Sequence, residues 1–262
     1  MSKTFKRYEK KYLLSEVDFE NLMAKFTHYM KPDKFCRDGR YYTIYNIYFD
    51  TENHDIIRHS LSKPYYKEKL RLRSYTVPVN PNDPVFLELK KKIGGVVSKR
   101  RAEITCAEAF DFVEKGIRPE KGDYLNEQVI KEIAQLLKHN TVMPKVFISY
   151  ERMAFFGKEN KDFRVTFDSN IKTRRSHLSL EEGAWGRNLI PENQYLMEIK
   201  IPGAIPLWLS QTLSENQIYS TSFSKYGAEY KNYCRQNPVK SFKIPDIPVF
   251  QPYILPPGCA VH

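Results

Sequence analysis

The chain has 262 residues, 41% of them hydrophobic, so it is long enough to bury the core of one large domain or two small ones. Lys and Arg number 42 and Asp and Glu number 31, and the resulting formal charge of +11 predicts a polyanionic partner. No apolar run is long enough to cross a bilayer, no signal peptide is visible, and the four cysteines form no C-x-x-C pair. These features argue against a membrane-spanning protein, a zinc site and a disulfide framework, and we expect a cytoplasmic protein with free thiols.

The first predicted elements are a strand over Arg7 to Leu14 and a helix that follows it directly. Ser15 and Asp18 have the spacing of a helix capping box, and apolar residues then continue at helical spacing until Pro32. An aromatic run from Tyr41 to Asp50 predicts a second strand.

The next strand, predicted over Lys67 to Thr76, is densely basic. Lys69, Arg71 and Arg73 alternate with leucines, and because side chains at i and i+2 share one face of a strand, these cations point the same way. Taken alone, this pattern fits a solvated strand face as well as a binding surface. Alternating ionisable residues recur, however, in Arg7 to Lys11, Leu87 to Lys90, Arg164 to Asp168 and Leu196 to Lys200.

A loop rich in Pro, Asn and Asp, from Pro78 to Pro84, separates the basic strand from a predicted hairpin. The hairpin strands are Val85 to Lys92 and Val96 to Ile104, joined through Gly94 and Gly95, which accept the positive φ of a tight turn. Two adjacent glycines also occur in phosphate-binding loops. The sequence context of such loops is missing here, so a plain turn is the better interpretation.

The remaining elements alternate between helices and strands. Thr105 and Glu108 form a second capping box for a helix that ends near Gly116. Further helices are predicted over Asn126 to Lys138, from Pro206 to Leu213, and from Ser222 or Ser224 to about Gln236, and further strands over Lys145 to Phe155, Phe163 to Thr173 and Tyr195 to Ile201.

The pattern indicates an α+β fold with mostly antiparallel strands. Several strands carry charge on one face and hydrocarbon on the other, so helices that cover the apolar face leave the charged faces inside. We therefore expect an antiparallel β-barrel of about eight strands that forms a basic tunnel, with helices packed on the outside. The domain is expected to comprise residues 1–236, followed by a proline-rich tail over residues 237–262.

Phosphate chains are the natural occupant of a tunnel lined by Lys and Arg, because both side chains bind phosphate oxygens. The carboxylates Glu9, Glu88 and Glu198 lie among these cations. They could hold Mg²⁺ or Mn²⁺ that bridges to phosphate, or each could pair with a neighbouring cation. For Glu9 and Glu88 both interpretations stay open.

Six short motifs follow one another along the chain. They are Arg7-x-Glu9-x-Lys11, Lys69 to Arg73, Glu88 to Lys90, Tyr150 to Arg152, Glu198 to Lys200 and Ser222 to Tyr226. This ordered set resembles the triphosphate tunnel metalloenzyme (CYTH-like) superfamily. It is most similar to the polyphosphate polymerase branch, typified by the vacuolar transporter chaperone (VTC) domain, and the resemblance covers roughly residues 5–235.

The resemblance implies a role for each matching residue. It implies catalytic contacts from Lys11, Arg71, Arg73, Lys90, Arg152 and Lys225. It implies substrate contacts from Arg100, Tyr150, Arg164, Lys200, Ser224, Glu9 and Glu88. It also implies that Glu198 binds the metal, Mn²⁺ or Mg²⁺. Arg100 is selected from Lys99, Arg100 and Arg101, where the strand phase could differ by one residue.

Three departures from the family pattern affect the expected activity. Arg7 replaces the first acid of the superfamily's E-x-E-x-K signature, which fits a polymerase better than a hydrolase. Ser222 stands where a basic residue precedes the Phe-Ser-Lys of the eukaryotic domain, which could weaken the grip on the polymer. The chain also lacks a regulatory helical domain and a membrane span, so we expect a stand-alone enzyme of bacterial type, with a possible separate membrane partner.

Three functions follow as hypotheses. The first is transfer of the γ-phosphate of ATP onto inorganic polyphosphate, and the second is hydrolysis of tripolyphosphate or a nucleoside triphosphate in the same tunnel. The third is a non-enzymatic polyanion or RNA binder, although a surface that only follows a nucleic-acid backbone would gain nothing from the interspersed acids. We therefore expect ATP and polyphosphate or triphosphate as partners, with no nucleic acid, and the oligomeric state stays open.

Overall fold

The computed structural model describes residues 8–36, 39–77, 79–120 and 122–238. Arg7, Pro78, Cys259 and the tail from residue 239 lie outside the described residues. Within the described part, the cysteines Cys36, Cys106 and Cys234 are free thiols. No helix in that part is both long and apolar enough to cross a bilayer.

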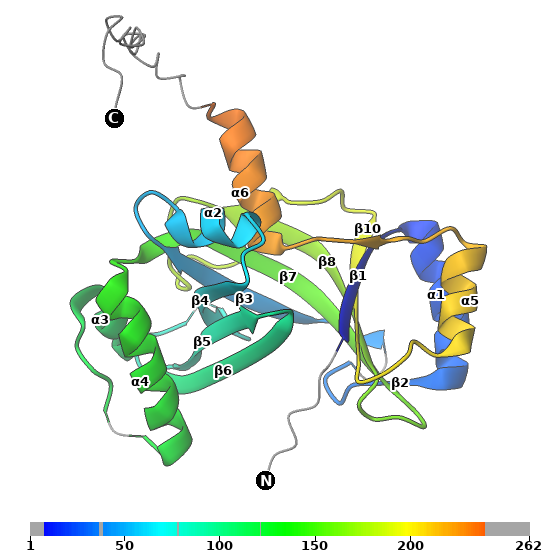
Figure 1. Cartoon of the computed structure of the whole chain (residues 1–262), viewed down its shortest axis with the longest axis horizontal. Helices are drawn as coiled ribbons and strands as arrows, with labels where there is room; N and C mark the ends of the chain where they lie inside the picture. Colours follow the sequence, from blue (N-terminus) through cyan, green and yellow to red (C-terminus); the bar gives the residue numbers. More distant parts are fainter. Residues whose placement is uncertain (1–7, 37–38, 78, 121, 239–262) are drawn as a thin grey trace, which may run out of the picture.

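One antiparallel sheet organises the molecule (Figure 1). Its path runs β11-β1-β10-β8-β7-β3-β4-β5-β6, with β2 and β9 attached to β7 and β8. Eight strands are long and three are short. The long strands are β1 (Tyr8–Ser15), β3 (Tyr42–Asp50), β4 (Tyr66–Ser74), β5 (Pro84–Ile93), β6 (Val96–Thr105), β7 (Met143–Gly157), β8 (Arg164–Arg174) and β10 (Gln194–Ile201). The short strands are β2 (Met30–Pro32), β9 (Arg187–Asn188) and β11 (Ser220–Thr221).

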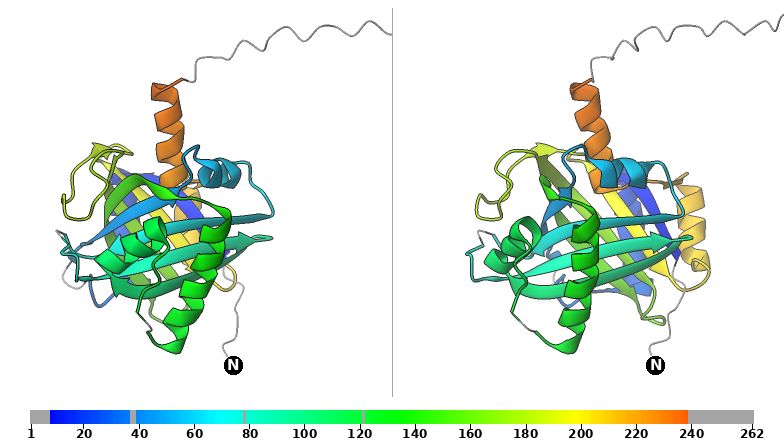
Figure 2. Two further views of the ribbon diagram at one scale, coloured as in Figure 1. Left: turned by 90° about the vertical axis from the view of Figure 1, so that its left-hand side faces the viewer. Right: turned by 60° about the vertical axis from the view of Figure 1, so that its left-hand side comes forward.

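The sheet curls until strands near its two edges meet through their side chains. Lys90 Nζ on β5 lies 3.8 Å from a carboxylate oxygen of Glu9 on β1, although five other strands lie between β1 and β5 along the sheet path. Between the described residues of β6 and those of β1 or β11 there is no backbone pairing, so the sheet is barrel-like without being closed. We call the concave side of this sheet the inner face and the other side the outer face (Figure 2).

Two pairs of helices cover the outer face, one pair at each end of the molecule in the view of Figure 1. The helices α3 (Cys106–Lys115) and α4 (Tyr124–His139) pack on β4, β5 and β6, and α1 (Glu16–Tyr29) packs with α5 (Leu207–Glu215) on β7, β8 and β10. In the strands that carry charged residues on the inner face, the apolar residues at the alternate positions fill these two cores. Leu70, Leu72, Leu87 and Leu89 belong to the first, and Val165, Phe167, Met197 and Ile199 belong to the second.

A third cluster occupies one end of the inner face. Here α6 (Lys225–Gln236) and the short helix α2 (Asp55–Leu61) approach β3 and β7. Tyr226 of α6 is 2% exposed, and its hydroxyl donates a hydrogen bond of 2.8 Å to Asp50 at the end of β3. The same carboxylate accepts the backbone N–H groups of Ile56 and Ile57, so it joins α2, α6 and the sheet.

The capping predictions are confirmed at the residue level. Ser15 with Asp18, and Thr105 with Glu108, form complete capping boxes, and Gly116 ends α3 at φ +72°. The hairpin turn adopts positive φ at Gly94 and Gly95. The prediction of α+β architecture with about eight strands is also confirmed, because eight long antiparallel strands form the curled sheet.

Four elements were not predicted from the sequence: the short strands β2, β9 and β11, and the helix α2. The strand β2 has only three residues, and α2 has seven residues without a side chain that caps its first turn. His54 precedes α2 in the left-handed conformation, with φ +62°, so none of the usual start signals is present. The helix α5 begins one residue later than predicted, with Pro206 as its N-cap residue.

Candidate functional site

Charged side chains from seven strands and one helix gather on the inner face. We call them the inner charge cluster. It consists of nine cations and four carboxylates: Lys11, Lys69, Arg71, Arg73, Lys90, Lys99, Arg152, Lys200 and Lys225, with Glu9, Glu88, Asp168 and Glu198. The cluster therefore has a formal excess of five positive charges when every amine is protonated, which is the electrostatic setting for an anionic ligand.

Strand register explains how residues far apart in sequence meet here. Lys11 on β1 pairs with Glu198 on β10, and Arg152 on β7 pairs with Asp168 on β8. Each of these four residues has at least one apolar strand neighbour in the outer core, namely Tyr12, Met197, Met153 and Phe167, and burial of these neighbours turns the charged residues to the inner face.

Glu88 and Asp168 are the two most enclosed acids of the cluster. The side chain of Glu88 is 1% exposed, and it lies 2.6 Å from Arg71, 3.0 Å from Lys99 and 3.7 Å from Arg73. Burial alone would raise the pKa of this carboxyl, but the three cations lower it to about 2. Glu88 is therefore a permanently charged anchor for cations of β4 and β6.

Asp168 has the same role on the opposite side of the inner face. It accepts two hydrogen bonds from Arg152, at 2.6 and 2.8 Å, and one from Lys225 at 2.5 Å. Burial opposes ionisation, yet Arg152 and Lys225 lower the pKa of Asp168 to about 2. This residue ties the first residue of α6 to the sheet.

Tyr150 lies beneath these cations. Its hydroxyl accepts a hydrogen bond of 3.0 Å from Arg73, and the ammonium of Lys225 lies 4.1 Å from the centre of its ring. Burial would raise the pKa of this phenol, but Arg73, Arg152 and Lys225 lower it to about 8. The hydroxyl is thus an unusually good hydrogen-bond donor to an anion.

Glu198 and Glu9 lie on neighbouring strands and share Lys11. Glu198 is 2.5 Å from Lys200 and 3.6 Å from Lys11, and Glu9 is 3.3 Å from Lys11 and 3.8 Å from Lys90. Burial disfavours the charged form of Glu198, but Lys200 and Lys11 hold the pKa of its carboxyl well below the usual value.

These two carboxylates determine what kind of metal site the inner face can offer. Within residues 8–36, 39–77, 79–120 and 122–238, no group of three or more His, Cys, Asp or Glu residues is arranged to hold a metal ion. Mg²⁺ and Mn²⁺ are commonly held by one or two carboxylates together with substrate phosphates and water. Glu198, with Glu9 beside it, fits a metal ion that arrives with phosphate rather than one held in a closed protein cage.

The N-terminus of α6 reaches the inner charge cluster. Ser224 caps the helix by accepting the backbone N–H of Gly227, and its hydroxyl also lies 3.2 Å from Lys69. Lys11 donates to the carbonyl oxygen of Phe223, at 3.0 Å. Residues 223–225 are therefore held from β1, β4 and β8 at once.

The structure places Arg100 on the other face of β6 from the one that the sequence analysis predicted. Arg100 points to the outer face, where it lies 3.3 Å from Glu132 of α4, so it does not line the inner face. Its neighbours do: Lys99 contacts Glu88, and Arg101 pairs with Glu88 in the strand register and stacks over Phe86 at 4.5 Å. The strand phase chosen from three consecutive cations was wrong by one residue.

The other predicted site residues occupy the inner face or its rim. Lys11, Arg71, Arg73, Lys90, Arg152, Lys225, Tyr150, Lys200, Ser224, Glu9, Glu88 and Glu198 come together in or beside the inner charge cluster. Arg164 lies further out, 3.6 Å from Asp33 and above the ring of Phe156.

Three members of the cluster were missed as site residues. Asp168 and Lys69 stand at the correct alternate positions of their strands, so the alternation itself could have identified them. Lys99 was set aside in favour of Arg100. Burial lowers the pKa of Lys69 to about 7, with Lys90, Lys67 and Lys11 adding to the shift.

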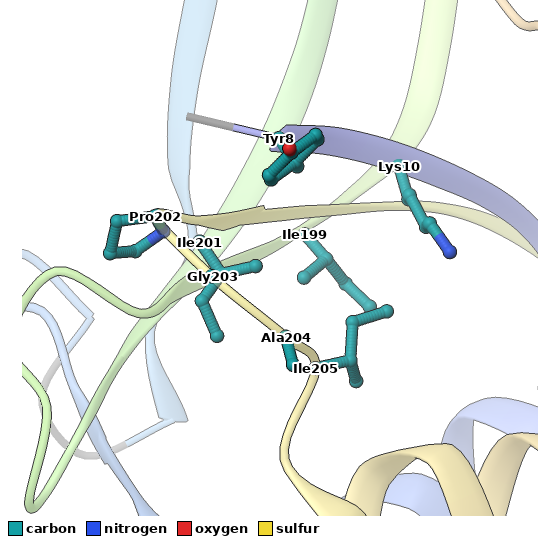
Figure 3. Close-up of a pocket in the computed structure, with 8 residues that line it drawn as sticks. All are labelled: Tyr8, Lys10, Ile199, Ile201, Pro202, Gly203, Ala204 and Ile205. Atoms are coloured by element: carbon teal, nitrogen blue, oxygen red, sulfur yellow. The ribbon is translucent and has the colours of Figure 1, made fainter. Parts of the chain in front are cut away.

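A separate pocket lies on the outer face, away from the inner charge cluster. Figure 3 shows that its lining comes from β1, the end of β10 and the loop that leads to α5. Apolar atoms and backbone dominate this lining, and Lys10 is its one ionisable amine. Such a lining offers little to a polyanion, so the charged inner face is the better candidate site.

The curled antiparallel sheet with a charged inner face defines a protein of the triphosphate-tunnel type. Two solved structures share this fold over most of their length. One is a provisionally named adenylate cyclase from Bacillus halodurans, with a TM-score of 0.50, 14% identity, and coverage of 84% of this chain and 95% of the other. The second is the provisionally named adenylyl cyclase HpAC1 from Hippeastrum, described as having a dominant triphosphatase activity, with a TM-score of 0.50, 17% identity, and coverage of 86% and 95%.

The family assignment follows from a sequence model. The model of the VTC domain matches residues 6–233, and the chain therefore belongs to the VTC domain family. No curated protein matches the chain in sequence.

Proposed function

We propose that the protein is a metal-dependent polyphosphate polymerase that transfers the γ-phosphate of ATP onto a growing inorganic polyphosphate chain. The observation that carries the proposal is the inner charge cluster, in which nine cations outnumber four carboxylates on one enclosed sheet face. Membership of the VTC domain family supports the same substrate class.

The chemistry requires no nucleophile from the protein. An oxygen of the terminal phosphate of the chain attacks the γ-phosphorus of ATP, the bond to the β,γ-bridging oxygen breaks, and ADP leaves. Arg71, Arg73, Arg152 and Lys225 would bind the phosphate oxygens and offset the charge that develops on them. Glu198 would hold Mg²⁺ or Mn²⁺, and the ion would supply positive charge that stabilises the phosphoryl transfer.

The pattern of acids favours transfer over hydrolysis. A hydrolase must position a water molecule as well as the metal, and acid clusters serve that purpose in the hydrolytic branch. Here each of the four acids of the cluster is engaged by two or more cations, and the described residues contain no group of three metal-ligating side chains.

Hydrolysis of tripolyphosphate or of a nucleoside triphosphate is the second candidate. The dominant triphosphatase activity described for HpAC1, which shares the fold, favours it. A cytoplasmic location and a separate membrane partner stay proposals that accompany the polymerase function.

One assay separates these functions. Purified protein is incubated with ATP and Mn²⁺, and the products are separated on a polyacrylamide gel with staining for polyphosphate. A ladder of long phosphate chains supports the polymerase, and orthophosphate without a ladder supports the triphosphatase. Salt-dependent RNA binding without ATP turnover would instead support a polyanion-binding protein.

A further inference from the structure

Two buried side-chain atoms of β8 lack a hydrogen-bond partner within the described part of the chain: Oγ1 of Thr166 and Nε of Arg164. Thr166 is 2% exposed. Its strand neighbours Val165 and Phe167 pack in the outer core, so Thr166 and Arg164 point to the inner face. The unpaired atoms therefore lie on the face that carries the inner charge cluster.

The immediate neighbours of Thr166 leave its hydroxyl without a protein partner. In the register, Thr166 lies opposite Glu198 on β10 and Ala154 on β7. Ala154 has no polar side chain. The Glu198 carboxylate is engaged by Lys200 and Lys11 instead.

A buried hydroxyl without a partner is unfavourable, and folded proteins rarely retain one unless a ligand or water completes it. Nε of Arg164 can only donate a hydrogen bond, so a ligand that satisfies it must present an acceptor oxygen. The inner charge cluster on the same face contains more cations than carboxylates, so a ligand drawn to this face is expected to be anionic.

We propose that the Thr166 hydroxyl donates a hydrogen bond to a phosphoryl oxygen of the bound phosphate chain, beside Glu198, with Arg164 Nε as the adjoining donor. The proposal rests on the proposed function, because it assigns a further binding residue to the same substrate. It makes Thr166 a substrate-binding residue that the sequence motifs do not contain.

The test compares Thr166→Val with Thr166→Ser. Valine keeps the shape of threonine and removes the hydroxyl, whereas serine keeps the hydroxyl. Affinity for inorganic tripolyphosphate is measured by titration calorimetry without nucleotide or metal, and thermal unfolding of the free protein is measured in parallel. We expect Thr166→Val to weaken binding about tenfold, or about 1.4 kcal/mol, and Thr166→Ser to bind within about threefold of the wild type.

Although Thr166→Val should weaken ligand binding, it should not destabilise the free protein. Because the hydroxyl has no partner in the free protein, Thr166→Val should unfold at the same or a higher temperature than the wild type. Thr212→Val on α5 is the matched control, since the Thr212 hydroxyl donates to the carbonyl of Trp208 at 2.7 Å in the outer core. That variant should lose stability and keep its affinity for tripolyphosphate.

The outcomes distinguish this inference from the proposed function. If the wild type binds tripolyphosphate and Thr166→Val binds it equally well, the role of Thr166 is wrong while the proposed function stands. The role is also wrong if Thr166→Val melts at a lower temperature, because the hydroxyl then has a structural partner. If the wild type does not bind tripolyphosphate, both fail together.

Discussion

The carboxylates of the inner face act as bridges between cations. Asp168 joins Arg152 of β7 to Lys225 of α6, and Glu88 joins Arg71 of β4 to Lys99 of β6. Like charges placed this close would repel one another strongly without an intervening acid. The acids therefore fix the spacing of the cations, so that the proposed phosphate chain would meet donors that are already in position.

Among these acids, Glu198 has the most specific proposed role, and Glu198→Gln tests it. The amide keeps the size of the side chain but is a much weaker metal ligand. We expect loss of at least about a hundredfold in turnover with ATP and Mn²⁺, with tripolyphosphate affinity retained within a few-fold. Turnover is measured by polyphosphate synthesis, and affinity by calorimetry.

Glu132→Gln provides the control for that experiment. Glu132 also lies between two cations, Lys91 at 3.0 Å and Arg100 at 3.3 Å, but on the outer face. This variant should retain normal turnover. Undiminished activity of Glu198→Gln would refute the assigned metal role.

Lys69 predicts a pH dependence of stability. Its pKa of about 7 in the folded protein lies below the ordinary lysine value of 10.5, so the unfolded chain binds more protons between these pH values. Stability contributed by this group therefore rises as pH increases from about 7 to 10.5. We expect Lys69→Met to be more stable than the wild type by about 2–4 kcal/mol near pH 7, with the difference shrinking toward pH 10.

Denaturant unfolding at several pH values measures this difference. Lys69→Arg is the control, because its guanidinium stays protonated across the range, so its difference from Lys69→Met should not depend on pH. A constant difference between wild type and Lys69→Met would contradict the assigned pKa shift.

At the scale of single residues, the sequence predicted most of the inner face because leucines fix the strand phase. Lys69, Arg71 and Arg73 alternate with Leu70 and Leu72, and only one phase buries the leucines. Lys99, Arg100 and Arg101 are three consecutive cations, so they do not show the phase by themselves. The phase follows from Ala102 and Ile104, which share the face of Arg100 and pack in the outer core, but this apolar signal is shorter and weaker than that of the leucines in β4.

At the scale of elements, α6 is the helix that brings binding residues to the sheet. Beyond Ser224 and Lys225, it is held by Glu229, which accepts two hydrogen bonds of 2.7 Å from Arg175. Arg175 also contacts His54 at 2.8 Å and stacks over Tyr233 at 3.8 Å. These contacts connect α6 to the segment before α2 and to the end of β8.

Glu229→Gln tests whether this connection positions the N-terminus of α6. Removing the carboxylate charge leaves the Arg175 guanidinium poorly compensated, so the helix should open more often. We expect amide hydrogen exchange in α6 to speed up about tenfold, and polyphosphate synthesis to fall several-fold through kcat.

Glu215→Gln on α5 is the control. Glu215 pairs with Lys25 on the solvent-exposed surface, and exposed pairs contribute little to stability. Exchange rates in α6 and turnover should both stay unchanged. Normal turnover in Glu229→Gln despite faster exchange would mean that the α6 contact does not limit catalysis.

Most elements could be predicted because each carries its own local signal. Capping boxes marked the starts of α1 and α3, and alternation marked the long strands. The order of strands could not be predicted, because β1 pairs with β10 and β3 pairs with β7 across long stretches of sequence. Such pairings depend on how the whole sheet curls, which no local pattern encodes.

At the scale of the whole molecule, an occupied inner face should stabilise the fold. A ligand that binds only the folded protein adds about 2.7 kcal/mol at a hundred times its Kd, or roughly 5–10 °C in Tm for a chain of this size. We expect tripolyphosphate to raise Tm by this amount at low salt, and less at high salt as the charges are screened.

The matched variants are Arg152→Ala and Lys91→Ala. Arg152 belongs to the inner charge cluster, whereas Lys91 lies on the outer face beside Glu132. Scanning calorimetry should find the ligand-induced shift reduced in Arg152→Ala and retained in Lys91→Ala. Equal shifts in both variants would mean that the ligand binds elsewhere.

The two edges of the curled sheet are not hydrogen-bonded to each other, and this has a mechanical consequence. Among the described residues, β5 and β1 approach each other through the ion pair of Lys90 and Glu9, and no hydrogen-bonded ladder runs between the two edges. A partly exposed ion pair is worth about 1 kcal/mol or less, far below the cost of breaking a ladder. We therefore expect the wall to part more easily along this line than between any two hydrogen-bonded strands, which would let a long linear polymer enter from the side without being threaded from one end.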